Sequence, residues 1–340
     1  MLDLVIRHKS VNIGSINNYS PWQIMIRLLS LTFVLSLTLH LQAQKEYGFD
    51  NRKASGQPYL TPEETVQRMK VAQGFSVKLF AGEPMMTNPI AMTVDQKGRV
   101  WIIESFEYPK RTPAGKAPRD RIVILEDTNG DGKADKRTVF AEGKDFPVTE
   151  ERKAQGLGAF DMASGIEVGY GGCFVGAPPY LFHIKDNNND DKADSFEIVA
   201  HGFGSQDTHE TLNTFTWGPD GWLYGLHGVF TISKVLKGAP DPSASEPAID
   251  MDAGVWRYHP RLKKFEMFAE GTSNPWGMDF TPEGECIICC CVIPHLFHIV
   301  PGGIYIKQGG KPSYNQYAYG ALKEICDHTF HKESGWAHAG

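Results

Sequence analysis

The sequence predicts an all-β protein of the β-propeller type. One strand–turn–strand module recurs four times, around the turn glycines Gly98, Gly172, Gly221 and Gly284. Its spacing suits blades of four strands joined by loops of uneven length. The 35 glycines and 21 prolines fit the many turns of an all-β chain, and a hydrophobic content of 41% is ample for a substantial core. A β-sandwich built from similar hairpins is the structural alternative.

The N-terminal region, residues 1–44, has the composition of a secretory signal peptide. Arg27 precedes an apolar run from Leu28 to Leu41, and the small residue Ala43 follows it. That order of charged, apolar and small residues is typical of export signals. A buried helix or a membrane anchor is the alternative, although the run is short and rich in hydroxyl side chains for a membrane span. We therefore expect an exported protein, located in the periplasm or the cell envelope.

A polar linker and one short helix precede the strands. We expect the linker at residues 45–60. Thr61–Glu64 then places a threonine at the N-cap, a proline at the first helical position and a glutamate at the third, which predicts a helix ending near Val71. From Gly74 onward short apolar strands alternate with turn residues. We assign residues 61–340 to a propeller that is truncated at its C-terminal end.

Four of the six cysteines lie close together, at Cys286, Cys289, Cys290 and Cys291. Their neighbours are isoleucine and valine, which favours a core strand that uses cysteine as a small hydrophobic residue. A disulfide or metal cluster is the less favoured alternative. No Cys-x-x-Cys-His motif for covalent haem attachment occurs in the sequence.

An aspartate-rich loop predicts a structural calcium site. The candidate ligands are Asp127, Asn129, Asp131, Lys133 and Asp135. Side-chain oxygens at alternate positions can converge on one hard cation, and Gly132 permits the sharp turn that such loops need. No bidentate glutamate closes the site, so a loop of Asx-turns without metal is an equal alternative. The loop from Asp186 to Asp194 repeats the order but has Asp191 in place of the glycine, and there we favour the plain loop.

Polar residues near the ends of expected strands are candidates for a site at one mouth of the propeller. These residues are His209, His227, Asn274 and Glu104. A neutral histidine can accept a proton from a substrate hydroxyl group, and a carboxylate or amide can orient it. For each residue taken alone, a hydrogen-bonded rim position without catalytic role is the alternative.

Several segments carry a resemblance to a known family. The segments are Gly74–Ala81, Asn88–Met92, Gly218–Tyr224 and Ser273–Phe280. They resemble blade signatures of the glucose/sorbosone dehydrogenases. More narrowly, residues 61–340 resemble the propeller part of the membrane-bound, haem-binding dehydrogenase family of planctomycetes and their relatives. His209–Gly221 and Val292–His298 are the most specific links.

The resemblance implies a six-bladed propeller, of which about four to five blades fall within this chain. It implies oxidation of a sugar or an alcohol by hydride transfer to pyrroloquinoline quinone, with cytochrome c as the next electron acceptor. His209 matches the catalytic base, and Asn274 matches one cofactor contact, with His227 and Glu104 as further candidates. Ser273 stands where the quinoproteins have an arginine, which removes a charge-assisted contact to an anionic quinone.

Two other functions are compatible with the sequence. One is a non-catalytic propeller that binds carbohydrate or a partner protein, and the other is a propeller hydrolase or lyase that uses the His209 region. The net charge of −6 and the lack of a basic run predict no binding to nucleic acid.

Overall fold

The computed structural model describes residues 59–106, 108–154, 160–291, 295–307, 309 and 320–326. The expected signal region 1–44 and nearly all of the linker 45–60 lie outside the described residues. The chain divides into two units, and the boundary along the sequence lies between Thr61 and Pro62. The fold described below belongs to the second unit. Within the described ranges, no helix has the length and apolar character needed to cross a membrane.

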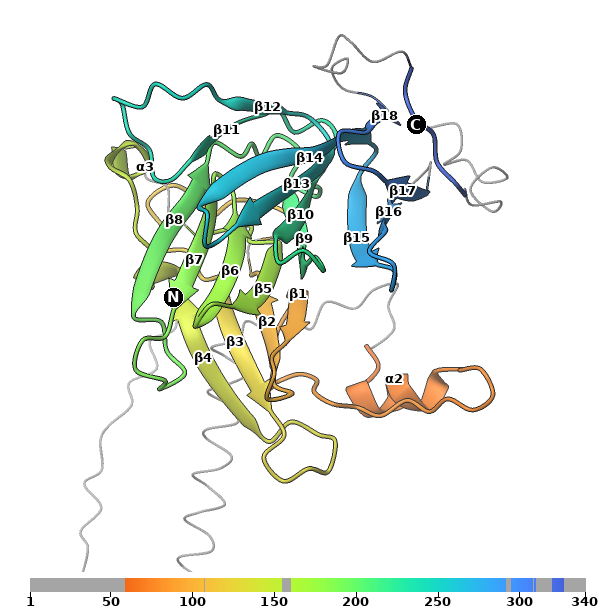
Figure 1. Cartoon of the computed structure of the whole chain (residues 1–340). Coiled ribbons are helices and arrows are strands. Elements are labelled where there is room, and N and C mark those ends of the chain that lie inside the picture. Colours follow the sequence, from red (N-terminus) through yellow and green to blue (C-terminus); the bar gives the residue numbers. More distant parts are fainter. Residues whose placement is uncertain are drawn as a thin grey trace, which may run out of the picture. The chain divides into compact units, whose positions relative to one another are not determined.

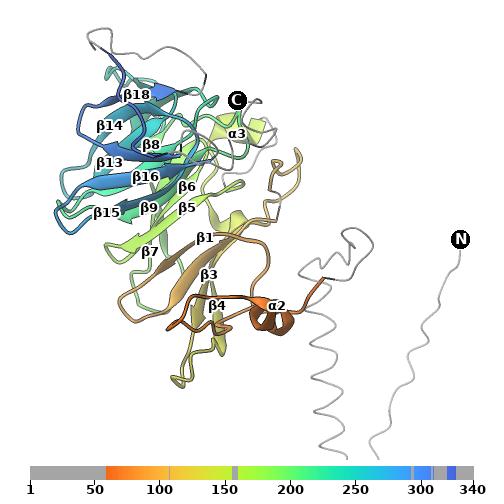
Figure 2. The ribbon, with the colours of Figure 1, turned by 90° about the vertical axis from the view of Figure 1, so that its right-hand side faces the viewer.

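Four antiparallel sheets follow one another along the chain (Figures 1 and 2). The first holds β1 (Pro89–Val94), β2 (Val100–Glu104), β3 (Arg121–Glu126) and β4 (Lys136–Glu142). The second holds β5 (Gly165–Gly169), β6 (Gly172–Ala177), β7 (Tyr180–Lys185) and β8 (Ser195–His201). The third holds β9 (Leu212–Trp217), β10 (Leu223–His227), β13 (Gly254–His259) and β14 (Lys264–Thr272). The fourth holds β15 (Pro275–Phe280), β16 (Cys286–Cys290) and β17 (Leu296–Ile299).

The sheets are the blades of a propeller. The first strands of the blades are neighbours in space, because β5 contacts both β1 and β9, and β9 contacts β15. The middle strands are buried on both faces. Ile102, Ile103, Ile122 and Val123 of β2 and β3 are all shielded from solvent, which explains why these strands are continuous apolar runs rather than alternating ones. The predicted all-β propeller is confirmed, with four blades in the described part of the chain.

Three further strands extend the outer edges of the blades. The chain leaves the third blade after β10 and forms β11 (Ser233–Lys237) and β12 (Ile249–Met251). Strand β11 pairs with β8, the outermost strand of the second blade. Strand β18 (Ile304–Lys307) pairs in parallel with β14, the outermost strand of the third blade. The C-terminal ends of two outer strands, β8 and β14, are thus paired by chain that follows later in the sequence.

Helices are short and few in the described ranges. Helix α2 spans Pro62–Arg68 and confirms the predicted N-terminal helix, although it ends before the expected Val71. The sequence did not predict the 3-10 turn η3 (Gly143–Asp145) or helix α3 (Glu150–Ala154), which lie in the connection between the first two blades.

The hairpin turns are formed by glycines in the left-handed region, with one correction. Gly98, Gly221 and Gly284 have φ values of 77°, 80° and 89° at the predicted turns. In the second blade the turn is made by Tyr170 and Gly171, with φ values of 53° and 81°, and Gly172 is the first residue of β6. Two successive positive φ values are the mark of a tight two-residue hairpin.

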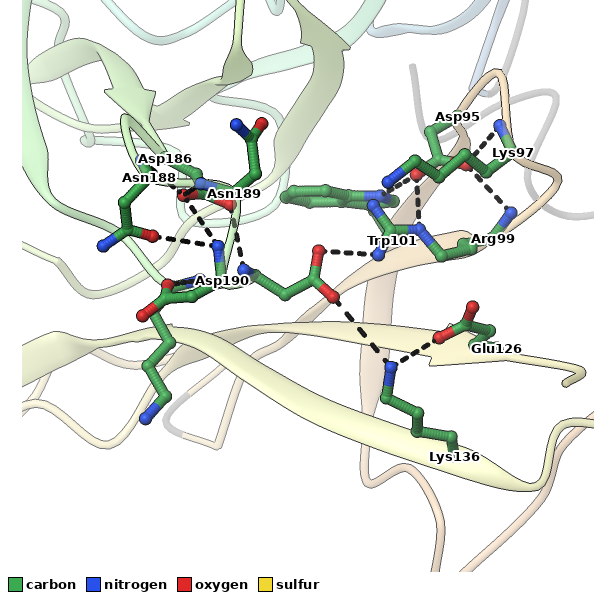
Figure 3. A network of polar contacts seen from close by, with 12 residues as sticks. Asp95, Lys97, Arg99, Trp101, Glu126, Lys136, Asp186, Asn188, Asn189 and Asp190 are labelled. Carbon is green, nitrogen blue, oxygen red and sulfur yellow. Dashed lines mark hydrogen bonds and ion pairs between the residues drawn. The ribbon is translucent and has the colours of Figure 1, made fainter.

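A buried ion-pair network joins the first blade to the second (Figure 3). Asp95 follows β1, and its carboxylate accepts hydrogen bonds from Arg99 Nε (2.8 Å) and Trp101 Nε1 (3.0 Å). Arg99 Nη1 also donates to Asp191 Oδ1 of the second blade at 2.7 Å. Arg99 is 7% exposed and Asp95 is 9% exposed. Burial opposes ionisation of Asp95, but the hydrogen bonds from Trp101 and Arg99 outweigh it and lower its pKa.

Asp191 takes the backbone conformation that its loop needs. Its φ of 63° is in the left-handed region, as is the φ of 87° at Gly132 in the equivalent position of the first loop. The sequence cast doubt on this turn because aspartate replaces glycine there. Left-handed backbone is uncommon but tolerated for aspartate, and the ion pair with Arg99 holds the residue in place.

We expect Arg99→Ala to lower the free energy of unfolding by roughly 3–5 kcal/mol, because it leaves the buried Asp95 carboxylate without its counter-ion. Urea titration followed by tryptophan fluorescence measures the change. Lys97→Ala is the matched control, because Lys97 lies on the same turn with an exposed side chain and should change stability by less than about 0.5 kcal/mol. Equal stability of the two variants would contradict a structural role for the network.

Candidate functional site

A cavity of about 570 Å³ lies where the chain enters the first strands of three blades. Its lining residues are Asn88, Pro89, Ile90, Tyr108, His209, Glu210, Trp276 and Cys291. Asn88 precedes β1, His209 precedes β9 and Trp276 lies on β15. Tyr108 belongs to the loop between β2 and β3, and Cys291 directly follows β16. The volume is within the range of pockets that bind small molecules.

Tyr108 and His209 form a hydrogen-bonded pair across two blades. Tyr108 Oη and His209 Nδ1 are 2.6 Å apart, and the two rings meet edge to face with centroids 5.5 Å apart. When Nδ1–H donates to the phenol oxygen, Nε2 is unprotonated and can accept a proton. Burial raises the pKa of Tyr108, as do the negative charges of Glu210 and Asp207. The phenol therefore stays protonated at neutral pH.

The loop that carries Tyr108 is held at one end by a buried aspartate. Asp120 accepts hydrogen bonds from the Phe106 amide (2.7 Å) and from Ser105 Oγ (3.0 Å). The amide of Met162, from the second blade, donates to the same carboxylate at 3.0 Å. Burial raises the pKa of Asp120 to about 6 despite these donors. The carboxylate thus joins the start of the Tyr108 loop to the neighbouring blade.

A second buried aspartate holds the middle of the same loop. Asp161 accepts hydrogen bonds from Arg111 Nη1 at 2.7 Å and from the Thr112 amide at 3.0 Å. Arg111 Nη2 also donates to the carbonyl of Pro178 at 3.2 Å. Because Tyr108 lies between the two anchored segments, its position is fixed by hydrogen bonds that tie its loop to Asp161, Met162 and Pro178, next to or in the second blade.

Glu210 is a buried acid beside the cavity. It is 8% exposed, and its Oε2 is shielded from solvent with no hydrogen-bond partner in the described part of the chain. Burial raises its pKa to about 8, and the negative charge of Asp207 adds to the effect. At neutral pH the side chain is therefore mainly the uncharged carboxylic acid.

Gly228 makes room for Glu210. Its amide donates to the Glu210 carbonyl at 3.2 Å, and a Cβ atom at position 228 would collide with the Glu210 Cβ. Any larger residue would therefore displace the backbone of Glu210. The close approach explains why the sequence has glycine at this position.

The cysteine-rich strand ends at the cavity. Cys286 and Cys290 are buried in β16, as predicted for a core strand, and all six cysteines of the chain are free thiols. Cys291 is exposed and lines the cavity. Its desolvation and the charge of Glu210 raise its pKa. Its amide donates to the Asn274 carbonyl at 2.7 Å, which fixes the strand end against the start of β15.

Glu104, a predicted cofactor contact, lies inside the first blade. Its carboxylate accepts hydrogen bonds from the Thr87 amide at 2.8 Å and from Arg137 Nη2 at 3.0 Å. Arg121 forms a further ion pair with it. These groups account for both carboxylate oxygens, and Glu104 is not among the residues that line the cavity.

His227 and Asn274 also have structural partners. His227 is fully buried on β10, with Nδ1 2.9 Å from the Gly228 carbonyl and Nε2 2.7 Å from Ser233 Oγ. Burial lowers its pKa to about 4, so the ring is neutral. Asn274 Oδ1 accepts a hydrogen bond from the Val229 amide at 3.0 Å. Of the four predicted site residues the structure places only His209 in the cavity lining, and cofactor contacts at the other three stay predictions.

The first aspartate-rich loop is organised by its own backbone amides. Asp127 accepts hydrogen bonds from Gly130 and Gly132, each at 2.7 Å. Asp131 accepts one from the Lys133 amide at 2.8 Å, and Asp135 one from Thr128 Oγ1 at 2.8 Å. The second loop repeats this pattern around Asp186. Among the described residues, no three His, Cys, Asp or Glu side chains are grouped to hold a metal ion, so calcium binding stays a prediction.

Sequence reasoning missed most of the cavity. Glu210 follows His209 directly, but it lies in a polar stretch, residues 205–211, so its residue type did not distinguish it from its neighbours. Tyr108 lies in a loop without periodicity, and nothing in the sequence relates it to His209. Trp276 belongs to the segment Ser273–Phe280, which carries the family resemblance, but the sequence did not predict it as a cavity residue.

The chain belongs to the family described as Domain of unknown function (DUF7133), whose model matches residues 61–319. Among curated proteins, none matches this chain.

Several solved structures are similar to the chain, and two of the following three are named as sugar dehydrogenases. The pyranose dehydrogenase PQQ domain from Coprinopsis cinerea is 14% identical, with a TM-score of 0.43 over 68% of this chain and 51% of that one. The PQQ-bound aldose sugar dehydrogenase from Streptomyces coelicolor is 13% identical, with a TM-score of 0.40 over 71% and 68%. The calcium-binding protein regucalcin from Agrobacterium tumefaciens is 9% identical, with a TM-score of 0.35 over 67% and 64%. The chain thus spans about half, 51%, of the pyranose dehydrogenase domain.

We expect Glu210→Gln to raise the melting temperature at pH 9 and to leave it unchanged at pH 4. The folded state holds the pKa near 8 against an ordinary value of 4.5, so this group lowers stability as pH rises from about 4.5 to 8. Glutamine stays uncharged throughout. Differential scanning calorimetry should show a gain on the order of 2–4 °C at pH 9.

Glu283→Gln is the matched control for this measurement, because Glu283 lies exposed on a hairpin turn of the fourth blade. Its substitution should leave the melting temperature unchanged at both pH values. A Glu210→Gln variant that behaves in the same way would show that the acid is not buried uncharged.

Proposed function

We propose that this family member is an exported, dehydrogenase-type propeller that binds a sugar or an alcohol in the cavity beside Tyr108 and His209. The observation that carries the proposal is the 2.6 Å hydrogen bond between Tyr108 Oη and His209 Nδ1. It orients an exposed imidazole at the mouth of a propeller, in a cavity of small-molecule size. The resemblance of the His209 segment to quinoprotein dehydrogenases supports the same assignment.

In this proposal His209 is the catalytic base. Oxidation of an alcohol removes a proton from its hydroxyl group and a hydride from its carbon, and the cavity residues account for the proton. His209 accepts it at Nε2, and Tyr108 stabilises the resulting imidazolium through the hydrogen bond at Nδ1. Trp276 provides an aromatic surface against which the apolar face of a sugar ring can pack.

The described cavity lining does not fit an anionic quinone. It contains no lysine or arginine, and the position of the expected arginine is taken by Ser273, which is fully buried. Pyrroloquinoline quinone and a cytochrome c acceptor follow from the sequence resemblance. Cationic contacts to such a quinone would come from residues outside the described lining. The proton transfer to His209 is the step assigned to the cavity residues, and the hydride would require an acceptor of this kind bound beside the substrate.

A non-catalytic carbohydrate-binding propeller is the second candidate. The same lining favours it, because an aromatic ring, an imidazole and an uncharged carboxyl group are suited to hydroxyl-rich ligands. The two functions differ in whether bound sugar reduces an electron acceptor.

We expect His209→Ala to abolish sugar-dependent dye reduction, by at least about a hundredfold, and to change sugar affinity only slightly. The full-length gene product, purified from the exported fraction, is assayed with calcium, pyrroloquinoline quinone and a panel of sugars and alcohols. Calorimetry measures binding separately.

His298→Ala is the matched control, because His298 pairs with Glu285 in the fourth blade and does not line the cavity. It should keep full turnover. Retained turnover in His209→Ala would exclude this residue as the base. Sugar binding without dye reduction in the wild type would favour the carbohydrate-binding function.

The calcium prediction for the first aspartate-rich loop is tested by thermal unfolding. Calcium that binds the folded state stabilises it, so the wild type should melt at a higher temperature in calcium than in EGTA. Asp131→Ala should remove this difference. Asp190→Ala, the equivalent change in the second loop, should keep it, and a wild type that does not respond to calcium would favour the Asx-turn loop without metal.

A further inference from the structure

We propose that the Glu210 carboxyl group selects the ligand of this cavity, by hydrogen-bonding a hydroxyl group of uncharged sugars and rejecting sugar acids. The inference rests on the proposed function in that it uses the same cavity. It names the substrate class, which the fold and the sequence resemblance leave open.

The first argument is the unmet hydrogen-bonding capacity of Glu210. Its side chain lines the cavity and is more than nine-tenths buried, and Oε2 has no partner in the described part of the chain. A buried polar atom without a partner carries a free-energy cost. Because Oε2 is shielded from solvent, the side chain must turn toward the cavity for a ligand hydroxyl group to bond to it, and that bond would remove the cost.

The second argument is that the backbone of Glu210 is fixed before a ligand arrives. Its carbonyl accepts the Gly228 amide at 3.2 Å. The residue after Gly228, Val229, donates its backbone amide to Asn274 Oδ1 at 3.0 Å. Gly228 also lies against the Glu210 Cβ, so the backbone of Glu210 is closely packed. A preorganised acceptor and donor lose little entropy on binding.

The third argument is the charge around the carboxyl group. The titratable groups that face it are Asp207 on its own loop, Tyr108 on the opposite loop, its neighbour His209, and Cys290 and Cys291 at the end of β16. No lysine or arginine lines the cavity in the described residues. An anionic ligand would therefore meet no counter-ion, and it would face a second negative charge whenever Glu210 is ionised.

The pH dependence follows from the same groups. Burial and Asp207 place the pKa of Glu210 near 8. Below that pH the carboxyl is uncharged and its repulsion of an anion is small. As pH rises through about 8 the carboxyl ionises, and discrimination against sugar acids increases.

The test compares neutral sugars with their uronic acids, which differ by one carboxylate that is ionised throughout the pH range used. Glucose with glucuronate and galactose with galacturonate are the probes, and calorimetry at pH 6 and pH 9 gives the affinities. Protection of Cys291 from a thiol reagent, mapped by peptide mass spectrometry, shows that binding occurs in this cavity. Neither readout requires turnover, so the inference stands or fails independently of dehydrogenase activity.

We expect the wild type to prefer the neutral sugar, and its preference to grow by about tenfold between pH 6 and pH 9. Glu210→Gln, which keeps the shape without the charge, should bind neutral sugars at pH 6 as the wild type does. Its preference should grow clearly less between pH 6 and pH 9 than that of the wild type, because only the other titratable groups of the cavity remain. Glu210→Ala should lose affinity for neutral sugars. Equal preference at both pH values in the wild type, or no protection of Cys291 by any neutral sugar, would overturn the inference.

Discussion

The guanidinium group of Arg99 lies between Asp95 of the first blade and Asp191 of the second, and the relative position of the two blades depends on this buried contact (Figure 3). Removing Arg99 would leave the buried Asp95 carboxylate without its counter-ion in a site of low polarity. The contact also explains why an aspartate in the second loop adopts a left-handed backbone that glycine adopts in the first. Polar contacts thus join the two sheets alongside their apolar side chains, and Thr93 Oγ1, which donates to Glu167 at 3.0 Å, is a further one.

The cavity inherits its geometry from this stacking of blades. Tyr108 comes from the first blade and His209 from the approach to the third, so their hydrogen bond requires the second blade to hold the correct spacing between them. Asp120 and Asp161 hold that spacing, because Asp120 binds the Met162 amide next to the second blade, and Asp161, also next to that blade, binds Arg111 and Thr112 of the Tyr108 loop. The geometry of the cavity is therefore a property of three blades together, and no single hairpin contains it.

The sequence predicts the fold much better than the site, and particular residues show why. Turn glycines such as Gly98 and Gly221 and the apolar runs of β2 and β3 follow local rules, so the hairpins and the propeller were predictable. The turn of the second blade was predicted one position too late, at Gly172, because a positive φ is not expected for a tyrosine such as Tyr170. Glu104 and His227 are polar residues at strand ends, and the sequence gives them the same pattern as His209. In the structure Glu104 is hydrogen-bonded to Arg137 and His227 to Ser233, within the blades. Only tertiary structure separates a polar residue with a partner from one that faces a cavity.

Strand β11 follows β10 of the third blade in the sequence but pairs with β8 of the second blade, and this affects how the chain folds during synthesis. Strand β8 completes the second blade at His201. The end of its outer edge is paired only when β11 emerges, some thirty residues later in the chain. Emergence from the ribosome proceeds at roughly 5–20 residues per second, so the edge is open for seconds during synthesis. Folding of adjacent blades is for this reason coupled in time, and the nascent chain passes through a state in which β8 is available for pairing with other strands.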